Sequence, residues 1–189
     1  MDKMIIGLTG QLAAGKTTVA KYLAEKYQGQ VYGFSKPLRD IADRMTLPQT
    51  RENMANLSSI LRAQFGQDII LRAILKDIEN EPCPFILLEG MRRYGDFLTF
   101  KEFPNFKLVA VIAEQELRYE RLTKRNQNID DAGKTFEQFK IDEQGEAEQD
   151  IPKAIAQADF TIDNNGDLDA LYEQAESIYQ QIKNDLKLN

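Results

Sequence analysis

The sequence contains no histidine and no tryptophan, and it contains one cysteine, Cys83. The absence of histidine excludes a histidine-based metal site, a catalytic triad and a histidine general base. A single cysteine allows neither a disulfide framework nor a metal site built from cysteines. Several common kinds of catalytic and metal site are thereby excluded.

Long apolar runs and an excess of basic residues are also missing. No apolar run approaches the ~20 residues of a membrane helix, and the run at 4–8 is too short for a signal peptide. With 24 Lys and Arg against 30 Asp and Glu, the formal net charge is −6, which argues against a surface for nucleic acid or anionic membranes. We therefore expect a cytoplasmic protein with no nucleic-acid partner and no membrane partner.

The 189 residues are enough for one domain, 1–189, and the hydrophobic share of 42% is ordinary for a globular protein. The ten arginines are unevenly placed, because all of them lie between Arg39 and Arg125. The planar guanidinium suits bidentate phosphate recognition, so this clustering predicts a central cleft for a small anionic substrate. The alternative is a set of solvated helix faces. Nothing in the sequence distinguishes a monomer from a homodimer.

One stretch fits the phosphate-binding P-loop pattern G-x-x-x-x-G-K-[ST]. The glycines let backbone N–H groups approach a polyphosphate closely. Lys16 would reach the outer phosphates, and the Thr17 hydroxyl would hold a Mg²⁺ ion that bridges them. The stretch reads Gly10-Gln11-Leu12-Ala13-Ala14-Gly15-Lys16-Thr17, and Thr18 follows it.

The context of the loop supports a functional match over a chance one. The apolar run before it has the length of a strand, and Val19, Leu23 and Tyr27 follow at helical spacing. Strand, glycine loop and helix therefore come in the order that directs a helix N-terminus at phosphate. We expect a nucleotide phosphate site here.

A second apolar run, 85–88, ends at Glu89. A continuous run of this kind predicts a strand buried on both faces of a parallel sheet. An acid at the end of such a strand is the second half of a P-loop site, where it orders Mg²⁺ or its water shell; a capping or surface glutamate is the alternative. Arg92 and Arg93 follow at the sheet edge where open α/β folds bind ligands.

Strands and helices alternate along the rest of the chain. Further strands are predicted at 31–34, 108–112 and 160–162. A helix is predicted to begin at Lys36, with Pro37 in its first turn, and further helices at 51–65, 68–78, 114–125, 136–149 and 168–182. This order predicts a three-layer α/β domain around a parallel sheet of about five strands. The connection after the second strand is enlarged, so we expect a substrate-covering insertion at about 35–80.

Three arginines of the helix predicted at 114–125 recur at three- and four-residue spacing. This spacing predicts that one helix face presents Arg118, Arg121 and Arg125 together. A basic stripe of this kind is costly unless an anion or acids face it. The polar stretch that follows is typical of a lid tip, and we expect a lid over about 118–150.

Several segments together resemble the nucleoside monophosphate kinase group of P-loop proteins, which includes adenylate-kinase-like enzymes and dephospho-CoA kinases. The likeness covers nearly the whole chain, although its strongest parts are short. The segments are Gly7 to Ala20, the acid-Gly-x-x-Arg segment Glu89 to Arg93, the helix from Arg118 to Arg125, Ile162 to Leu168 and, more loosely, Ser35 to Arg39.

The resemblance implies a P-loop kinase fold with strand order 2-3-1-4-5, an acceptor-binding insertion and a lid. It implies ATP and Mg²⁺ as cosubstrate and cofactor, with Thr17 and Glu89 placing the metal. It implies that Gly10 to Thr18 and Asn164 bind ATP, and that Lys16, Arg121 and Arg125 act on the transferring phosphoryl group. Acceptor binding would fall to Ser35, Arg39, Arg92 and Arg93.

One departure from the resemblance concerns the acceptor. Kinases that phosphorylate a hydroxyl generally carry an aspartate base after the second strand, whereas this chain has Ser35 and Lys36 there. A phosphate acceptor is already an anion and needs no base, so a (deoxy)nucleoside monophosphate is favoured. Dephospho-CoA stays open, with Asp40 as the nearest candidate base.

Two other classes of function compete with a kinase. The first is a P-loop NTPase whose hydrolysis or bound state signals to a protein partner. The second is a nucleotide-binding protein without turnover, which the intact set Lys16, Thr17 and Glu89 disfavours.

Overall fold

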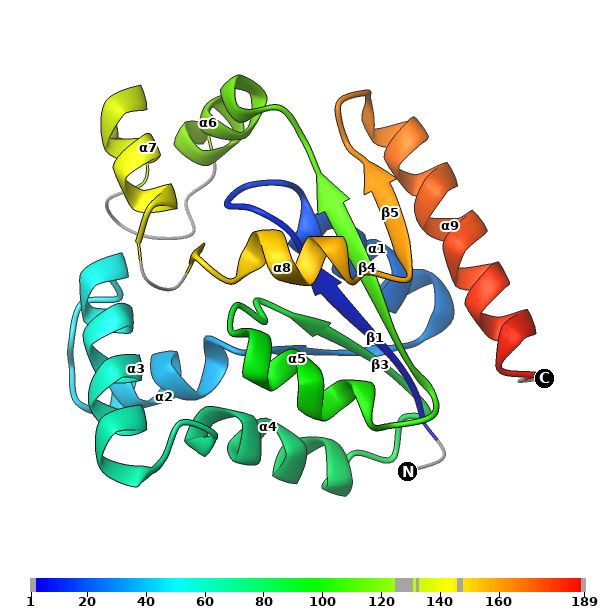
Figure 1. Cartoon of the computed structure of the whole chain (residues 1–189), viewed down its shortest axis with the longest axis horizontal. Helices are drawn as coiled ribbons and strands as arrows, with labels where there is room; N and C mark the ends of the chain where they lie inside the picture. Colours follow the sequence, from blue (N-terminus) through cyan, green and yellow to red (C-terminus); the bar gives the residue numbers. More distant parts are fainter. Residues whose placement is uncertain (1–2, 125–130, 132, 146–147, 188–189) are drawn as a thin grey trace.

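The computed structural model describes residues 3–124, 131, 133–145 and 148–187. Its centre is a sheet of five parallel strands in the order β2-β3-β1-β4-β5, which confirms the predicted order (Figure 1). The strands are β1 (Met4–Thr9), β2 (Gln30–Gly33), β3 (Phe85–Glu89), β4 (Phe106–Ile112) and β5 (Phe160–Asp163).

Helices cover both faces of this sheet and extend past one of its edges (Figure 1). They are α1 (Lys16–Tyr27), α2 (Lys36–Arg44), α3 (Arg51–Phe65), α4 (Ile69–Asn80), α5 (Tyr94–Lys101), α6 (Gln115–Lys124), α7 (Phe136–Glu143), α8 (Ile151–Ala156) and α9 (Leu168–Asp185).

Alternate residues of β1, the central strand, point to opposite faces of the sheet. This strand therefore contributes side chains to two hydrophobic cores, one on each face. On one face, Ile6 and Leu8 of β1 pack with Leu23 of α1 and Ile178 of α9. On the other face, Ile5 packs with side chains of α4 and α5, including Ile74, Phe97 and Phe100. All six residues of β1 are buried, as expected for the middle strand of a parallel sheet covered on both sides.

A third, smaller cluster connects the P-loop to the upper helices of Figure 1. Leu12 and Ala13 of the loop pack there against Leu122 of α6 and Phe139 of α7. The backbone of the loop is therefore held by apolar contacts on one side as well as by the sheet behind it.

The predicted elements are largely confirmed, with three differences. The helix expected at 136–149 ends at Glu143, and two short helices, α5 and α8, were not expected. Neither short helix has a side-chain cap at its N-terminus: α5 begins after Arg93 in extended conformation, and α8 has Pro152 in its first turn.

The carboxyl ends of all five strands lie at one edge of the sheet. The P-loop follows β1 there, Ser35 follows β2, Gly90 follows β3 and Asn164 follows β5. Segments more than a hundred residues apart in sequence therefore converge on one site.

Candidate active site

The P-loop owes its shape to two glycines with positive φ. Gly10 has φ 144°, and a Cβ there would lie 2.1 Å from the backbone oxygen of Val111. Gly15 has φ 109°, and its Cβ would lie 2.2 Å from Nδ2 of Asn164. Since both the conformation and the space exclude a side chain, the glycines of the motif are required by the fold of the loop itself.

Lys16 folds back over the loop that precedes it. Its Nζ donates hydrogen bonds to the backbone oxygen of Gly10 at 2.6 Å and to that of Gln11 at 2.8 Å. This places the ammonium group inside the curve of the loop, at the N-terminus of α1, where backbone amides and the helix dipole both favour an anion.

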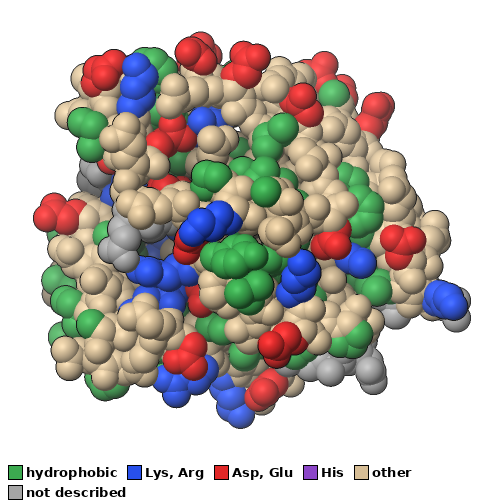
Figure 2. All heavy atoms as spheres, viewed as in Figure 1, with side chains coloured by type: hydrophobic (Ala, Val, Ile, Leu, Met, Phe, Trp, Pro, Cys, Tyr) green, Lys and Arg blue, Asp and Glu red, His purple; other side chains and the backbone are tan. Residues whose placement is uncertain are grey.

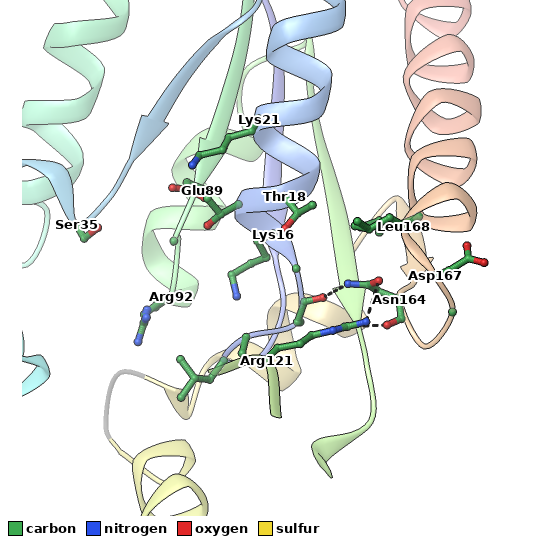
Figure 3. A pocket seen from close by; sticks show the side chains of 18 residues that line it. Lys16, Thr18, Lys21, Ser35, Glu89, Arg92, Arg121, Asn164, Asp167 and Leu168 are labelled. Atoms are coloured by element: carbon green, nitrogen blue, oxygen red, sulfur yellow. Dashed lines mark hydrogen bonds between the residues drawn. The ribbon is translucent and has the colours of Figure 1, made fainter. Parts of the chain in front are cut away.

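A cavity of about 800 Å³ opens beside the loop, within the range of small-molecule sites (Figure 3). The predicted ATP-binding residues Leu12, Ala13, Ala14, Gly15, Lys16, Thr17, Thr18 and Asn164 line it, while Gly10 and Gln11 do not. Glu89 and Arg121 line it as well, so the structure brings the predicted metal and lid residues to the same cavity as the P-loop.

Thr17 and Glu89 suit the expected cation in their chemistry. Mg²⁺ takes oxygen ligands and is commonly bound by one or two protein groups together with substrate phosphates and waters. A hydroxyl and a carboxylate that line the same cavity match that donor set. Among the residues that the structure describes, no group of three or more His, Cys, Asp or Glu is arranged to hold a metal by itself.

Asn164 braces the P-loop from the last strand. Its buried Nδ2 donates to the backbone oxygen of Ala14 at 2.8 Å, and its own backbone oxygen accepts from Nη1 of Arg121 at 2.9 Å. Figure 3 shows this chain of contacts beside the cavity. Burial lowers the pKa of Arg121, but a guanidinium in a protein remains protonated.

Of the predicted basic stripe on α6, the structure describes Arg118 and Arg121. Arg118 is 3% exposed, and its Nε donates to the backbone oxygen of Ala113 at 2.9 Å while Nη1 donates to that of Leu12 at 3.2 Å. Its guanidinium also forms an ion pair with Glu143 of α7. Arg118 therefore holds the P-loop and α7 together, and its charge is met by an acid. Arg125 lies outside the described residues.

A second cavity, of about 560 Å³, adjoins the first. The four predicted acceptor-binding residues, Ser35, Arg39, Arg92 and Arg93, all line it. Ser35, Gly90 and Arg92 line both cavities, so the two meet at the ends of β2 and β3. Figure 2 shows a hollow over the region of α3 and α7 in which Lys and Arg side chains gather.

Acidic side chains already contact several of these basic groups. Arg92 forms an ion pair with Glu148, and Arg51 of α3 forms one with the fully buried Asp131, at 2.9 Å. Asp142 lies near Arg51 and forms an ion pair with Lys134. An anionic ligand in the second cavity would compete with these carboxylates.

Several residues of the site were not identified from the sequence. Lys21 lines the first cavity, and Arg51, Arg62, Asp96 and Glu148 line the second. The clustering of arginines in the middle of the sequence was the one feature that pointed to any of these residues, namely Arg51 and Arg62. Nothing in the spacing of the acids marked Asp96 or Glu148, because each reaches the cavity through tertiary structure.

The predicted alternative base does not line either cavity. Asp40 forms an exposed ion pair with Lys36, one helical turn away, at 2.7 Å.

The chain matches the model of an AAA domain family over residues 6–149. It belongs to this family. A UPF0200 protein of Methanocaldococcus jannaschii is 31% identical over 186 residues, which are 97% of this chain and 93% of that protein. The AAA domain match contains the P-loop and both strands that flank β1.

Solved structures similar to this AAA domain protein include small-molecule kinases. Shikimate kinase from Bacteroides thetaiotaomicron superposes with a TM-score of 0.61 at 20% identity, covering 98% of this chain and 99% of that one. Dephospho-CoA kinase from Campylobacter jejuni gives 0.54 at 17% identity, covering 96% and 98%. At these identities the likeness shows the fold alone. It confirms the predicted resemblance to the P-loop kinase group.

In the part of the chain that the structure describes, no helix combines the length and the apolar character needed to span a membrane.

Proposed function

We propose that this protein transfers the γ-phosphoryl group of ATP to the phosphate of a (deoxy)nucleoside monophosphate, with Mg²⁺. One observation carries the proposal: the P-loop cavity and the arginine-lined cavity meet at Ser35, Gly90 and Arg92. Two anionic substrates bound in these cavities would place their phosphates together at that junction, as an in-line phosphoryl transfer requires.

On the ATP side, the loop amides and Lys16 bind the β- and γ-phosphates. Thr17 and Glu89 hold the Mg²⁺ ion, which when bound supplies charge neutralisation between the phosphates. Arg121 lines the same cavity, where its guanidinium would stabilise charge on the transferring group. Asn164 keeps both the loop and Arg121 in position through its hydrogen bonds to Ala14 and Arg121.

On the acceptor side, Arg39, Arg92 and Arg93 bind the phosphate of the monophosphate. An oxygen of that phosphate forms the new bond to the γ-phosphorus, the bond from that phosphorus to the β–γ bridging oxygen breaks, and ADP leaves. The protein supplies position and positive charge rather than covalent chemistry. The acceptor phosphate replaces Glu148 as the partner of Arg92.

The surroundings of Asp40 support a phosphate acceptor over a hydroxyl. A general base must lie within hydrogen-bond reach of the proton that it removes, whereas Asp40 is exposed and paired with Lys36 on the surface of α2. Dephospho-CoA remains the second candidate, since the fold is shared with a dephospho-CoA kinase. A regulatory P-loop NTPase is the third.

The proposal also assigns roles to two larger segments. Residues of about 35–80, which contain α2, α3 and α4, act as the acceptor-binding insertion. Residues of about 118–150 act as the lid, although 125–130, 132 and 146–147 of that segment lie outside the described residues. Both segments belong to a single kinase domain, 1–189.

The test is ADP release from Mg·ATP with a panel of ribo- and deoxynucleoside monophosphates and dephospho-CoA, one at a time. We expect at least one monophosphate to stimulate release strongly. Stimulation by dephospho-CoA alone would overturn the choice of acceptor while leaving a kinase. A rate that no acceptor changes would overturn the kinase and favour the NTPase.

A further inference from the structure

Two side chains from outside the P-loop donate hydrogen bonds to its backbone oxygens. Nη1 of Arg118 on α6 donates to the oxygen of Leu12 at 3.2 Å, and Nδ2 of Asn164 donates to that of Ala14 at 2.8 Å. Both donors belong to buried residues, which are 3% and 4% exposed. Leu12 lines the P-loop cavity whereas Arg118 does not, so the guanidinium approaches the loop from outside the cavity.

A backbone oxygen that is held in place also fixes the direction of the next amide. In a planar trans peptide, the C=O and N–H bonds point in opposite directions. Because the oxygen of Leu12 is held outside the cavity, the N–H of Ala13 is turned towards it. The bond to Ala14 fixes the N–H of Gly15 in the same way. Within the described part of the chain, neither N–H group has a hydrogen-bond acceptor, so both are available to an anion.

The backbone conformation of Ala13 requires support from its surroundings. Ala13 has φ 60°, in the left-handed region that is unfavourable for a residue with a Cβ. Such a conformation persists only where the surrounding structure enforces it. Leu122 and Phe139 pack against the loop here, but apolar contacts are non-directional and do not orient a peptide group. The hydrogen bond from Arg118 does, because it requires the oxygen of Leu12 on its own side.

Arg118 is itself held in a fixed orientation. Its Nε donates to the backbone oxygen of Ala113 at 2.9 Å, and its Nη1 forms an ion pair with Glu143 of α7. Glu143 in turn accepts a hydrogen bond from Gln115 at 2.7 Å. The guanidinium carbon lies 5.6 Å from the centre of the Phe139 ring. A guanidinium is a rigid planar fork of N–H donors, so Arg118 binds two carbonyls and a carboxylate at once, which the single ammonium of a lysine cannot do in this geometry.

We propose that Arg118 is a positioning residue for the nucleotide: it orients the N–H of Ala13 towards the phosphates and thereby increases the affinity of the P-loop for them. This inference rests on the proposed function, to which it adds a residue that lines neither cavity. An amide that already points at the anion binds it without a prior rearrangement of the loop. Since Glu143 holds Arg118, the same contacts connect the phosphate site to α7.

The experiment measures the Kd of Mg·ADP by equilibrium titration, well below the melting temperature of each variant. Arg118→Met/Glu143→Leu removes both charges of the pair together, so we expect it to fold. It should bind Mg·ADP about tenfold more weakly than the wild type, which is the loss expected for one hydrogen bond to a charged group. A role confined to stability would lower the melting temperature and leave the Kd of the folded protein unchanged.

Two controls separate the carbonyl contact from the ion pair. Glu143→Gln keeps Arg118 and an oxygen that accepts from it, so its Kd should stay within about twofold of the wild type. Lys26→Met/Glu176→Leu removes an ion pair that joins α1 and α9 and lines neither cavity, and it should bind Mg·ADP as the wild type does.

Two results would overturn the inference: wild-type affinity in Arg118→Met/Glu143→Leu, or a loss in Glu143→Gln as large as in the double variant. If the double variant does not fold, Arg118→Lys keeps a charge beside Glu143 but lacks the planar fork, and wild-type affinity in that variant would overturn the inference as well. Binding that depends on Arg118, without phosphoryl transfer to any acceptor, would contradict the proposed function and leave this inference standing.

Discussion

At the scale of single residues, the position of the Lys16 side chain determines how it can contribute to the rate of phosphoryl transfer. Its ammonium lies within the loop, bonded to the carbonyls of Gly10 and Gln11. In a phosphoryl transfer, a mobile point charge in this place stabilises the negative charge on the outer phosphates as it moves to the leaving group. No other residue of the loop carries a charge.

We expect Lys16→Ala to lower kcat by about a hundredfold or more, since one preorganised electrostatic group contributes on that scale. The melting temperature should change little, because the lysine is not part of the packed core. The measurement is steady-state ADP release beside a thermal melt. Lys76→Ala, which removes an exposed lysine from α4, serves as the control. Full activity in Lys16→Ala would remove the loop from the mechanism.

At the scale of elements, α8 fixes the start of α5 and thereby the Arg92–Arg93 segment. Oδ2 of Asp150, at the N-terminus of α8, accepts the backbone N–H of Tyr94 at 3.1 Å. This hydrogen bond, more than the nearby Lys153, lowers the pKa of the Asp150 carboxyl. The acid therefore stabilises the fold when it is ionised.

We expect Asp150→Ala to destabilise the chain by about 1 kcal/mol at pH 7, the usual net value of one such hydrogen bond. Since the folded pKa is depressed, the stabilisation is present above the unfolded pKa of about 4 and is lost as pH falls through the folded pKa. Urea unfolding of both chains at pH 7 and towards pH 3 should show the difference shrinking. Asp77→Ala, an exposed acid on α4, should show no such change; a pH-independent Asp150 effect would contradict the assignment.

The elements also show how far sequence reasoning reaches. The five strands and the long helices were predictable because strong local signals mark them: continuous apolar runs, the glycine motif and the periodicity of α3 and α9. The short helices α5 and α8 were not, because six to eight residues carry too few turns for a period to emerge. The prediction therefore succeeded only for the strands and helices that a local sequence pattern marks.

The residues of the candidate site also fall into those that the sequence predicted and those that it did not. The P-loop and Glu89 were named from a motif and a strand end, and the four acceptor-binding residues from the resemblance to monophosphate kinases. The structure brings most of the loop, Glu89 and these four residues to two adjoining cavities. The contacts of Arg118 could not be predicted, because helical spacing gives the face of a residue but not the carbonyls that its guanidinium reaches. Asp96 and Glu148 could not be named, since their partners Arg62 and Arg92 are 34 and 56 residues away.

At the scale of the whole molecule, nucleotide binding should stabilise the fold. A ligand that binds only the folded state contributes about 2.7 kcal/mol at a hundred times its Kd, which corresponds to roughly 5–10 °C in Tm for a chain of this size. A thermal melt with Mg·ADP should show this increase, and Lys16→Ala should lose most of it. An unchanged melting temperature at millimolar Mg·ADP would argue against nucleotide binding in the first cavity.

The strand order also bears on the emergence of the chain from the ribosome. The first strand made, β1, lies between β3 and β4, and the amide of Asn164 that supports Ala14 comes 150 residues later. At about 5–20 residues per second, that brace is translated roughly 8–30 seconds after the loop it supports. A nascent chain therefore contains the P-loop sequence long before Asn164, which braces the loop, has been made. If the loop binds nucleotide as proposed, we expect that affinity to appear only after the segment that carries Asn164 has been made.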